Sequence, residues 1–277
     1  MTMNRAVPLY FDFLIEGFRR GEVGRFVHLG HWDTADPMQP GGPGEFERAQ
    51  ERLNAILLDM ADLRSGQDIL DVGCGFGGTL HEVNRAHSNM RLTGVNIDPR
   101  QLDLCGQIEA LNGNRINWKQ ADACRLPFPD NAFDRVLCVE AMFHFASRRA
   151  FFREAARVLR QGGVLVASDI VLAESAARLD IPRFCIEAPL RDGYGPWPDL
   201  WGNDADHREL GSAASLRCTA CVDATANTLP SHRFTCPASA DERADPGDPT
   251  LRAALMLKWL HHAGHLRYWY MRFEKSA

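Results

Sequence analysis

The clearest periodic pattern in the chain begins at Phe46. Apolar residues from Phe46 to Leu63 recur at helical spacing, which predicts an amphipathic helix ending near residues 64–66. The period then changes, because residues 68–72, DILDV, form a short apolar run of the kind that makes a buried strand. Glycines follow directly after this strand, and residues 79–86 are expected to form a second helix. This pattern predicts a strand, a glycine turn and a helix in succession.

The alternation of strand-like and helix-like segments continues for another hundred residues. Further strands are expected at 92–97, 116–120, 135–139 and 164–170, and further helices at 99–111 and 149–159. Strands that alternate with helices form parallel sheets with helices on both faces.

The alternation is lost after Val171. Residues 173–213 carry a broken pattern rich in Pro, Gly and Trp, which indicates an insertion or cap. Strand character returns at 216–225, helical spacing at 250–262, and a final alternating run at 265–274. The last two strands could pair at one edge of the sheet.

These elements predict an α/β fold with a doubly wound, mostly parallel, seven-stranded sheet and helices on both faces. We expect four parts: an N-terminal helical segment over 1–64 that packs on the active site, a core over 65–171, a substrate-binding cap over 172–215, and C-terminal strands and a helix over 216–277 that complete the sheet.

Composition narrows the possible partners. The chain has 31 Lys and Arg against 36 Asp and Glu, a net charge of −5, so nucleic acid is not expected as a partner. With 45% hydrophobic residues the chain can bury a full core. The longest apolar stretches, such as 162–168, are far shorter than the roughly 18 residues of a membrane span. The N-terminus lacks an export signal, so a cytoplasmic location is expected.

The cysteines and histidines suggest no metal site. Eight cysteines are scattered along the chain and are expected to be reduced thiols. Cys218 and Cys221 have zinc-ligand spacing, but no second pair completes four ligands. His261, His262 and His265 lie at a predicted helix end, where imidazoles interact favourably with the helix dipole.

Residues 71–78, DVGCGFGG, lie where a strand meets a helix, so backbone amides can approach a ligand closely there. Two motifs fit the segment. Gly73, Gly75 and Gly78 give GxGxxG, a weak dinucleotide pattern, whereas Asp71 with Gly73, Gly75 and Gly77 gives DxGxGxG. A carboxylate at this turn would repel pyrophosphate and attract an ammonium or sulfonium group. The charge of Asp71 favours the second motif.

Four segments carry a family resemblance: DVGCGFGG, GVNIDPRQ at 94–101, QADACRLPFPDNAFDRVLCVEAMFHF at 120–145, and FFREAARVLRQGGVLVASDI at 151–170. Residues 66–171 resemble the Rossmann-like S-adenosylmethionine-dependent methyltransferases. The resemblance implies cofactor contacts at the amino-acid end from Asp71, Gly73, Cys74, Gly75 and Gly77, at the ribose from Asn96 and Ile97, and at the adenine from Asp122 and Ala123.

The same resemblance narrows to one branch. GVNIDPRQ, together with HLGHWD at 28–33, is similar to the sterol and isoprenoid C-methyltransferases and the rebeccamycin-type sugar O-methyltransferases. In that branch a Gln near Gln101 approaches the cofactor. Asn96 departs from the usual acid for the ribose hydroxyls, and Asp98 follows two residues later. An amide can still hydrogen-bond a diol, although a carboxylate accepts both protons better.

Methyl transfer requires an aligned, dry acceptor and a base where a proton must leave. His144, just beyond the fourth predicted strand, is the best base candidate, with capping of the next helix as its alternative role. Asp169, at the end of the fifth strand, could orient that imidazole, bind the substrate, or be an ordinary strand-end acid. Glu140 is the third ionisable group of this rim and is expected to contact the cofactor near its sulfonium.

Aromatic residues from variable segments could form an apolar lid over the acceptor, or could only cover the core of the sheet. The predicted acceptor contacts are His31, Trp32, Phe143, Tyr194, Trp197 and Trp201. Arg178, Arg183 and Arg191 are spread out, which weakens the case for an isoprenyl diphosphate acceptor.

The sequence therefore predicts a methyltransferase of secondary metabolism that acts on a small molecule and releases S-adenosylhomocysteine, with O-methylation favoured over C- or N-methylation. Two alternatives stay open: a protein of this fold that keeps the cofactor for a structural role while catalysing a cyclisation or rearrangement, and a nicotinamide dehydrogenase that rests on GxGxxG alone. The oligomeric state is left open, with a homodimer as one option.

Overall fold

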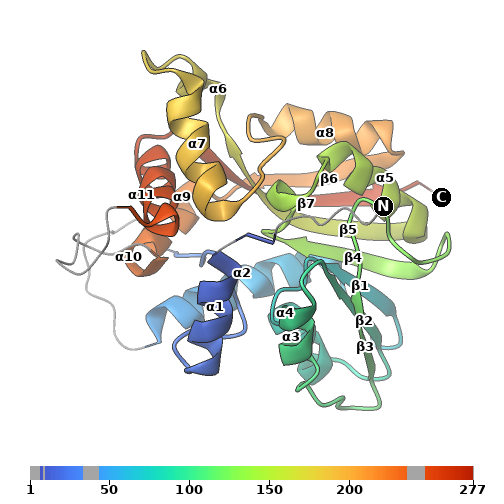
Figure 1. Ribbon diagram of the computed structural model, residues 1–277. Helices are drawn as coiled ribbons and strands as arrows, with labels where there is room; N and C mark the ends of the chain where they lie inside the picture. Colours follow the sequence, from blue (N-terminus) through green and yellow to red (C-terminus); the bar gives the residue numbers. More distant parts are fainter. Residues whose placement is uncertain (1–6, 9, 34–43, 236–246, 277) are drawn as a thin grey trace, which may run out of the picture.

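In the computed structural model, which describes residues 7–8, 10–33, 44–235 and 247–276, seven strands form one sheet (Figure 1). The strands are β1 (Asp68–Val72), β2 (Arg91–Asn96), β3 (Arg115–Gln120), β4 (Phe133–Val139), β5 (Leu159–Leu172), β6 (Leu216–Asp223) and β7 (Leu266–Lys275). Their order is β3-β2-β1-β4-β5-β7-β6. The first five are parallel, and β7 is antiparallel to both β5 and β6. The predicted fold class is confirmed.

Helices lie on both faces of this sheet. The described α-helices are α1 (Tyr10–Arg19), α2 (Glu45–Ala61), α3 (Gly78–Ala86), α4 (Pro99–Cys105), α5 (Arg148–Val158), α6 (Glu174–Ala177), α7 (Arg183–Tyr194), α8 (Asp204–Ala213), α9 (Thr225–Thr228), α10 (His232–Thr235) and α11 (Pro249–His262). The short 3-10 helices η1 (Met142–His144) and η2 (Leu229–Ser231) lie after β4 and after α9.

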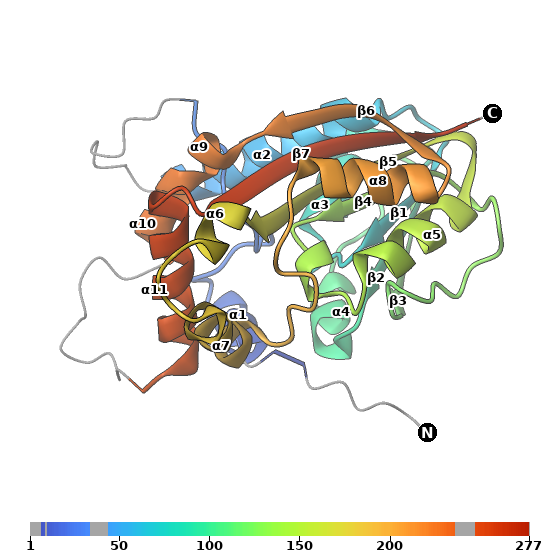
Figure 2. The ribbon, with the colours of Figure 1, turned by 90° about the horizontal axis from the view of Figure 1, so that it is seen from above.

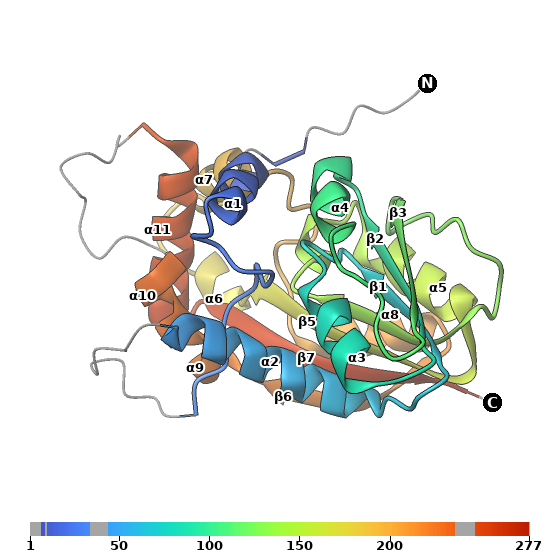
Figure 3. The same ribbon diagram turned by 90° about the horizontal axis from the view of Figure 1, so that it is seen from below.

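Alternation along the strands produces two apolar cores. Ile69 of β1 packs in the core that includes α2 and α3, whereas its neighbour Leu70 packs in the core that includes α5. Figure 2 views the molecule from the side of α5 and α8, and Figure 3 from the side of α2 and α3. Ile69 and Leu70 are both fully buried, so the short apolar strand predicted from DILDV lies between the two cores.

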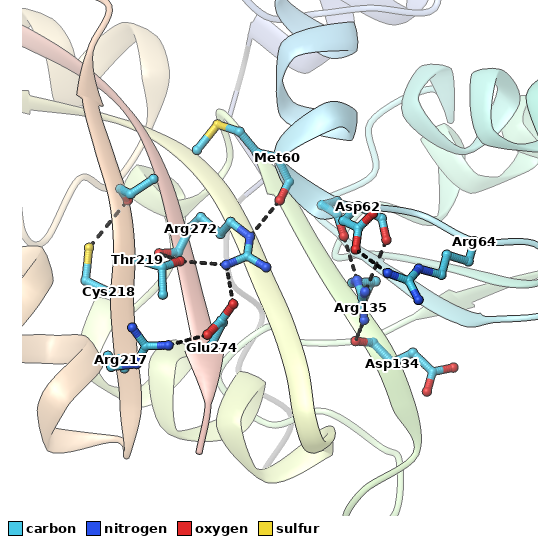
Figure 4. A network of polar contacts seen from close by, with 12 residues as sticks. Met60, Asp62, Arg64, Asp134, Arg135, Arg217, Cys218, Thr219, Arg272 and Glu274 are labelled. Carbon is cyan, nitrogen blue, oxygen red and sulfur yellow. Dashed lines mark hydrogen bonds and ion pairs between the residues drawn. The ribbon is translucent and has the colours of Figure 1, made fainter. Parts of the chain in front are cut away.

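A network of arginines fixes the end of α2 to the sheet (Figure 4). Arg272 of β7 donates to the carbonyl of Met60 at 2.8 Å, and Arg135 of β4 donates to the carbonyls of Ala61 at 2.6 Å and Asp62 at 3.1 Å. The last carbonyls of a helix have no partner within it, and cations are favoured there. These contacts lie at the amino ends of the parallel strands.

Two predicted boundaries are wrong. The helix expected over 99–111 ends at Cys105, because the next segment bonds elsewhere: the side chain of Asn84 bonds to the carbonyl of Glu109 and the amide of Leu111, both at 2.9 Å. The strand expected over 164–170 runs instead from Leu159 to Leu172, because Leu159 pairs with Phe133 of β4 and residues 164–172 pair with β7.

The segment expected as a cap divides between two places. α8 packs on β6 and α5, whereas α7 packs against α11. A Cβ on Gly193 of α7 would lie 2.4 Å from the Cβ of Ala253, so a glycine is needed where these two helices meet. Figure 1 and Figure 3 show α1, α7 and α11 gathered on one side of the molecule.

Candidate active site

A cavity of about 1090 Å³ opens at the carboxyl ends of the parallel strands. Its floor comes from residues 71–75 at the end of β1, 95–97 at the end of β2, 121–123 after β3, and 139–141 and 143–145 at the end of β4. Its walls come from α1, residues 22–29, the first turns of α2, and parts of α7, α10 and α11. The carboxyl ends of parallel strands are where open α/β sheets bind ligands, and this volume is large enough for a cofactor beside an acceptor.

The glycine turn lies on the cavity floor. Gly73 has φ 78° and Gly75 has φ 53°, backbone conformations that favour glycine. A Cβ on Gly73 would lie 2.4 Å from the Cβ of Ala141. The amides of Gly73 and Cys74 both donate to the carbonyl of Val95, at 2.9 and 3.1 Å, which ties the turn to β2. Gly77, with φ 79°, is the N-cap residue of α3.

Asp71 has a buried oxygen that nothing in the described part of the chain satisfies. The residue is 2% exposed, and its Oδ2 has no hydrogen-bond partner there. Burial raises the pKa of its carboxyl group to about 7. A cation placed beside this oxygen would both satisfy it and favour the ionised form. The residues present therefore fit the ammonium group of an amino acid.

The ends of β2 and β3 offer neutral and acidic groups to the same cavity. Asn96 donates from Nδ2 to Gln101 at 2.8 Å and accepts at Oδ1 from the amide of Ile97 at 2.7 Å. Asp122 and the buried Ala123 also line the cavity, with Oδ1 of Asp122 accepting from the amide of Cys124 at 2.8 Å. All the predicted cofactor residues except Gly77 line this cavity, Gln101 from α4 and the others from the strand ends and the turns that follow them. Gly77, the N-cap residue of α3, does not line it.

Asp98 does not line the cavity. Its side chain caps α4 by accepting from the amide of Arg100 at 2.9 Å, and it forms an ion pair with the same residue at 2.8 Å. Arg100 also pairs with Asp12 of α1. Asp98 therefore has a structural role in joining α1 to α4.

Glu140 follows β4 with φ 48°, an uncommon conformation for a residue with a side chain. Its Oε2 accepts two hydrogen bonds, from the amide of Leu29 at 2.9 Å and from the hydroxyl of Tyr268 at 2.6 Å. Burial raises the pKa of its carboxyl group to about 7. Among the described residues no hydrogen bond forms to its other oxygen, Oε1, and Glu140 lines the cavity.

His144 ends η1 and also lines the cavity. Its Nε2 lies 2.6 Å from the hydroxyl of Tyr10 in α1. Its Nδ1 is buried and has no partner among the residues the structure describes. Burial lowers the pKa of the imidazole to about 3, so His144 is neutral near pH 7. The cavity that Glu140 lines therefore also contains a neutral imidazole with one nitrogen bonded and the other without a partner among the described residues.

Comparison with known proteins agrees with this geometry. A family model described as a methyltransferase domain matches residues 70–167. An O-methyltransferase from Pyrenophora dematioidea is 31% identical over 205 residues, which cover 72% of this chain and 70% of the relative. The chain belongs to the S-adenosylmethionine-dependent methyltransferases. The dinucleotide interpretation of the glycine turn is therefore wrong.

Two further likenesses place the methyltransferase among its relatives. Methyltransferase GfsG from Streptomyces halstedii is 33% identical over 189 residues, which cover 66% of each chain, just under two thirds. The crystal structure of the cyclase SpnF has a TM-score of 0.71 at 20% identity, covering 97% of this chain and 94% of that one. At this identity the likeness shows the fold alone. Other solved structures of this fold hold S-adenosylmethionine or S-adenosylhomocysteine, and the cofactor is S-adenosylmethionine.

The structure gives Asp169 of the methyltransferase a different place from the predicted one. It is fully buried, bonded to Arg148 at 2.5 Å and to Nε2 of His207 at 2.8 Å. It does not line the cavity and makes no hydrogen bond to His144. Arg148 holds the pKa of this carboxyl below its usual value, so Asp169 is the anion of a buried ionic cluster. The predicted pairing with His144 is wrong.

Three of the six predicted acceptor contacts line the cavity of the methyltransferase. Phe143, Tyr194 and Trp197 line it, with the rings of Phe143 and Trp197 centred 4.5 Å apart. The other three predicted acceptor contacts do not line it, because each side chain bonds elsewhere. His31 bonds Tyr270 at 3.1 Å, Trp32 bonds Ser231 at 3.0 Å, and Trp201 bonds Glu187 at 2.8 Å.

Sequence reasoning missed several side chains at the site. Tyr10 and His28 lie in the N-terminal segment, Tyr268 in the last strand, and Phe234 and Leu257 in the C-terminal region. Only His28 had a local signal, since it begins the HLGHWD element. Its Nδ1 bonds the carbonyl of Leu29 at 2.7 Å, and burial lowers the pKa of its imidazole to about 4.

The described residues contain no group of three or more His, Cys, Asp or Glu placed to hold a metal ion. The seven cysteines in the described part of the chain are free thiols, and Cys236 lies outside it. Among the helices the structure describes, none is long and apolar enough to cross a membrane.

Proposed function

We propose that this methyltransferase transfers a methyl group from S-adenosylmethionine to a hydroxyl oxygen of a neutral, largely apolar small molecule. One observation carries the proposal: two proton-accepting side chains, Glu140 and His144, both follow β4 and line the same cavity, which has aromatic walls. Relatives named as O-methyltransferases support the choice of oxygen over carbon.

The cofactor half of the cavity follows from its polar groups. Asp71 would take the ammonium group, and the backbone of the glycine turn would face the amino-acid end. Asn96 and Gln101 would meet the ribose hydroxyls, and Asp122 with Ala123 the adenine. When bound, the cofactor supplies a methyl group that is already activated by the sulfonium charge.

The cavity as a whole is lined by more acidic than basic side chains. The charged residues that line the cavity are Glu22, Arg25, Glu45, Glu47, Asp71, Asp122, Glu140 and Arg233. The two arginines are already engaged: Arg25 donates to the carbonyl of Phe76 at 3.1 Å, and Arg233 lies over the rings of Trp32 and Phe234. A diphosphate would meet mainly carboxylates here, so a neutral acceptor fits better.

The pKa values divide the roles at the end of β4. A general base works best when its pKa lies near the working pH, and the pKa of Glu140 is about 7. The imidazole of His144, with a pKa of about 3, is a weaker base but can hydrogen-bond the acceptor hydroxyl. We therefore assign proton removal to Glu140 and acceptor orientation to His144.

The proposal is tested with S-adenosylmethionine carrying a ¹³C-labelled methyl group and a panel of hydroxylated polyketides, sterols and glycosides. We expect a product heavier by one methyl whose ¹³C chemical shift is that of a methoxy group. Glu140→Gln should lower turnover by about 10²-fold without weakening S-adenosylhomocysteine binding in calorimetry. A C-methyl signal, or full activity of Glu140→Gln, would contradict the proposal.

A cyclisation with the cofactor in a structural role is the second candidate, prompted by the fold shared with SpnF. The same assay separates the two. A rearranged product of unchanged mass, formed without S-adenosylhomocysteine, would favour the cyclase.

A further inference from the structure

We propose that Tyr268 and Ser168 are positioning residues for Glu140, which they hold in one orientation through a closed ring of hydrogen bonds. The proposal rests on the proposed function of Glu140. It concerns how the chain orients that carboxylate and sets its proton affinity.

Three contacts close the ring. The backbone amide of Glu140 donates to Oγ of Ser168 at 2.9 Å. The hydroxyl oxygen of Tyr268 lies 3.1 Å from the same Oγ, and that hydroxyl donates to Oε2 of Glu140 at 2.6 Å. A phenol has one proton, and an ionised carboxylate can only accept. With Glu140 ionised, Tyr268 therefore donates to the carboxylate, and Ser168 donates to Tyr268.

The ring joins three separate parts of the sheet. Ser168 lies on β5 and Tyr268 on β7, and both are fully buried. In the antiparallel register Ser168 faces Tyr270 and Ile170 faces Tyr268, so Tyr268 is the diagonal neighbour of Ser168 on one face. The ring includes the backbone amide of Glu140, so it supports the unusual φ of 48° together with the side chain.

The orientation leaves one oxygen for chemistry. Tyr268 and the amide of Leu29 both bind Oε2, while Oε1 has no hydrogen bond to any described residue. A carboxylate with one oxygen held by two donors presents the other in a fixed direction. A ring built only for folding would not need an ionisable group with an open oxygen on the cavity.

Several charged and titratable groups surround Glu140. From β7, Tyr268 donates to it, and Tyr270 is close enough for its own pKa to be raised by the carboxylate. The carboxylate of Glu140 also contributes to raising the pKa of Tyr10 in α1. From β5, the charge of Asp169 opposes ionisation of Glu140. Among these groups Tyr268 alone donates to the carboxylate, so its loss should favour the protonated form.

The test titrates Glu140 directly, in protein without cofactor or acceptor. NMR of protein with ¹³C-labelled glutamate carboxyl groups, assigned with Glu140→Gln, gives the protonation midpoint of Glu140. In Tyr268→Phe we expect the midpoint to rise by about one pH unit, the effect of losing one hydrogen bond to a charged group. Ser168→Ala should raise it by less, because the Tyr268 donor remains.

Tyr270→Phe is the matched control. It removes a hydroxyl from the same strand, but that hydroxyl bonds His31 rather than Glu140. In Tyr270→Phe we expect the protonation midpoint of Glu140 to equal that in the unmodified protein. Circular dichroism checks that each variant is folded.

Three outcomes decide the matter. The ring is supported if the protonation midpoint of Glu140 rises in Tyr268→Phe and Ser168→Ala but not in Tyr270→Phe. It is overturned if the midpoint is the same in all variants and the unmodified protein, or if it rises as much in Tyr270→Phe as in Tyr268→Phe. The inference fails on the titration, whereas the proposed function fails on the activity of Glu140→Gln, so the two failures are distinguishable.

Discussion

The hydroxyl of Tyr10 lies 2.6 Å from Nε2 of His144, so the first helix of the chain is bonded directly to the turn after β4. The same hydroxyl is within the electrostatic influence of Glu140 and Tyr194. Tyr10 therefore belongs to the group of side chains that would surround an acceptor hydroxyl.

Tyr10→Phe should lower kcat/KM for the acceptor by about fivefold to tenfold, the effect of one hydrogen bond of about 1 kcal/mol. Its ring contacts with Phe11 and Tyr194 are retained, so folding should be unaffected. Steady-state kinetics measure the first effect, and calorimetry with S-adenosylhomocysteine should show unchanged affinity. Loss of cofactor affinity instead would place Tyr10 in the cofactor half.

Gly73→Ala should abolish cofactor binding, because the new methyl group would lie 2.4 Å from the Cβ of Ala141 at a φ of 78°. Gly66→Ala is the control. It has a φ of 89°, with nothing within 4 Å of the added Cβ, and it lies before β1 rather than at the cavity. Calorimetry should show affinity for S-adenosylhomocysteine lost in the first variant and kept in the second. Equal affinities would mean that the turn tolerates the displacement.

Asp71→Asn should weaken cofactor binding and yet stabilise the cofactor-free protein at pH 8. Burial raises the pKa of Asp71 from 3.8 to about 7, so between those values the unfolded chain releases a proton that the folded protein keeps. The folded state therefore loses stability as the pH rises through this window. The gain from the amide should be on the order of a few kcal/mol at pH 8 and absent near pH 4. Urea unfolding at both pH values measures it, and a gain of the same size at both would refute the cause.

Asp169→Asn should destabilise the protein by about 3–5 kcal/mol, because the buried guanidinium of Arg148 loses its charged partner. Asp204→Asn is the control, since its pair with Arg208 is about half exposed and should contribute less than about 0.5 kcal/mol. Urea unfolding gives both values. If Asp169→Asn kept full stability but lost turnover, Asp169 would have a catalytic role after all.

The glycine turn shows how far local sequence reaches. A strand, a carboxylate and three glycines within the ten residues 68–77 define a ligand turn, because backbone geometry over so short a span depends on the residues themselves. The alternation of strands and helices was sufficient for the fold class for the same reason. The end of the helix at Cys105 was not predictable in this way, because it depends on the side chain of Asn84, twenty-one residues earlier.

The role of an acid or base group, in contrast, cannot be predicted from the residues next to it in the sequence. Asp169 has the position of a catalytic acid in the sequence, yet its partners Arg148 and His207 come from two different helices. A charge is assigned to catalysis or to structure by whether a counter-charge lies beside it in space.

The sequence by itself determined the parallel core, the glycine turn and the carboxyl group of Asp71 beside that turn, since each is encoded in consecutive residues with one dominant backbone conformation. The tertiary structure alone decided which oxygen of Glu140 is open and which nitrogen of His144 is bonded. Those contacts come from Tyr268 and Tyr10, 128 and 134 residues away along the chain. Such distant partners meet only through the antiparallel register of β5 with β7 and the packing of α1, which depend on the whole fold.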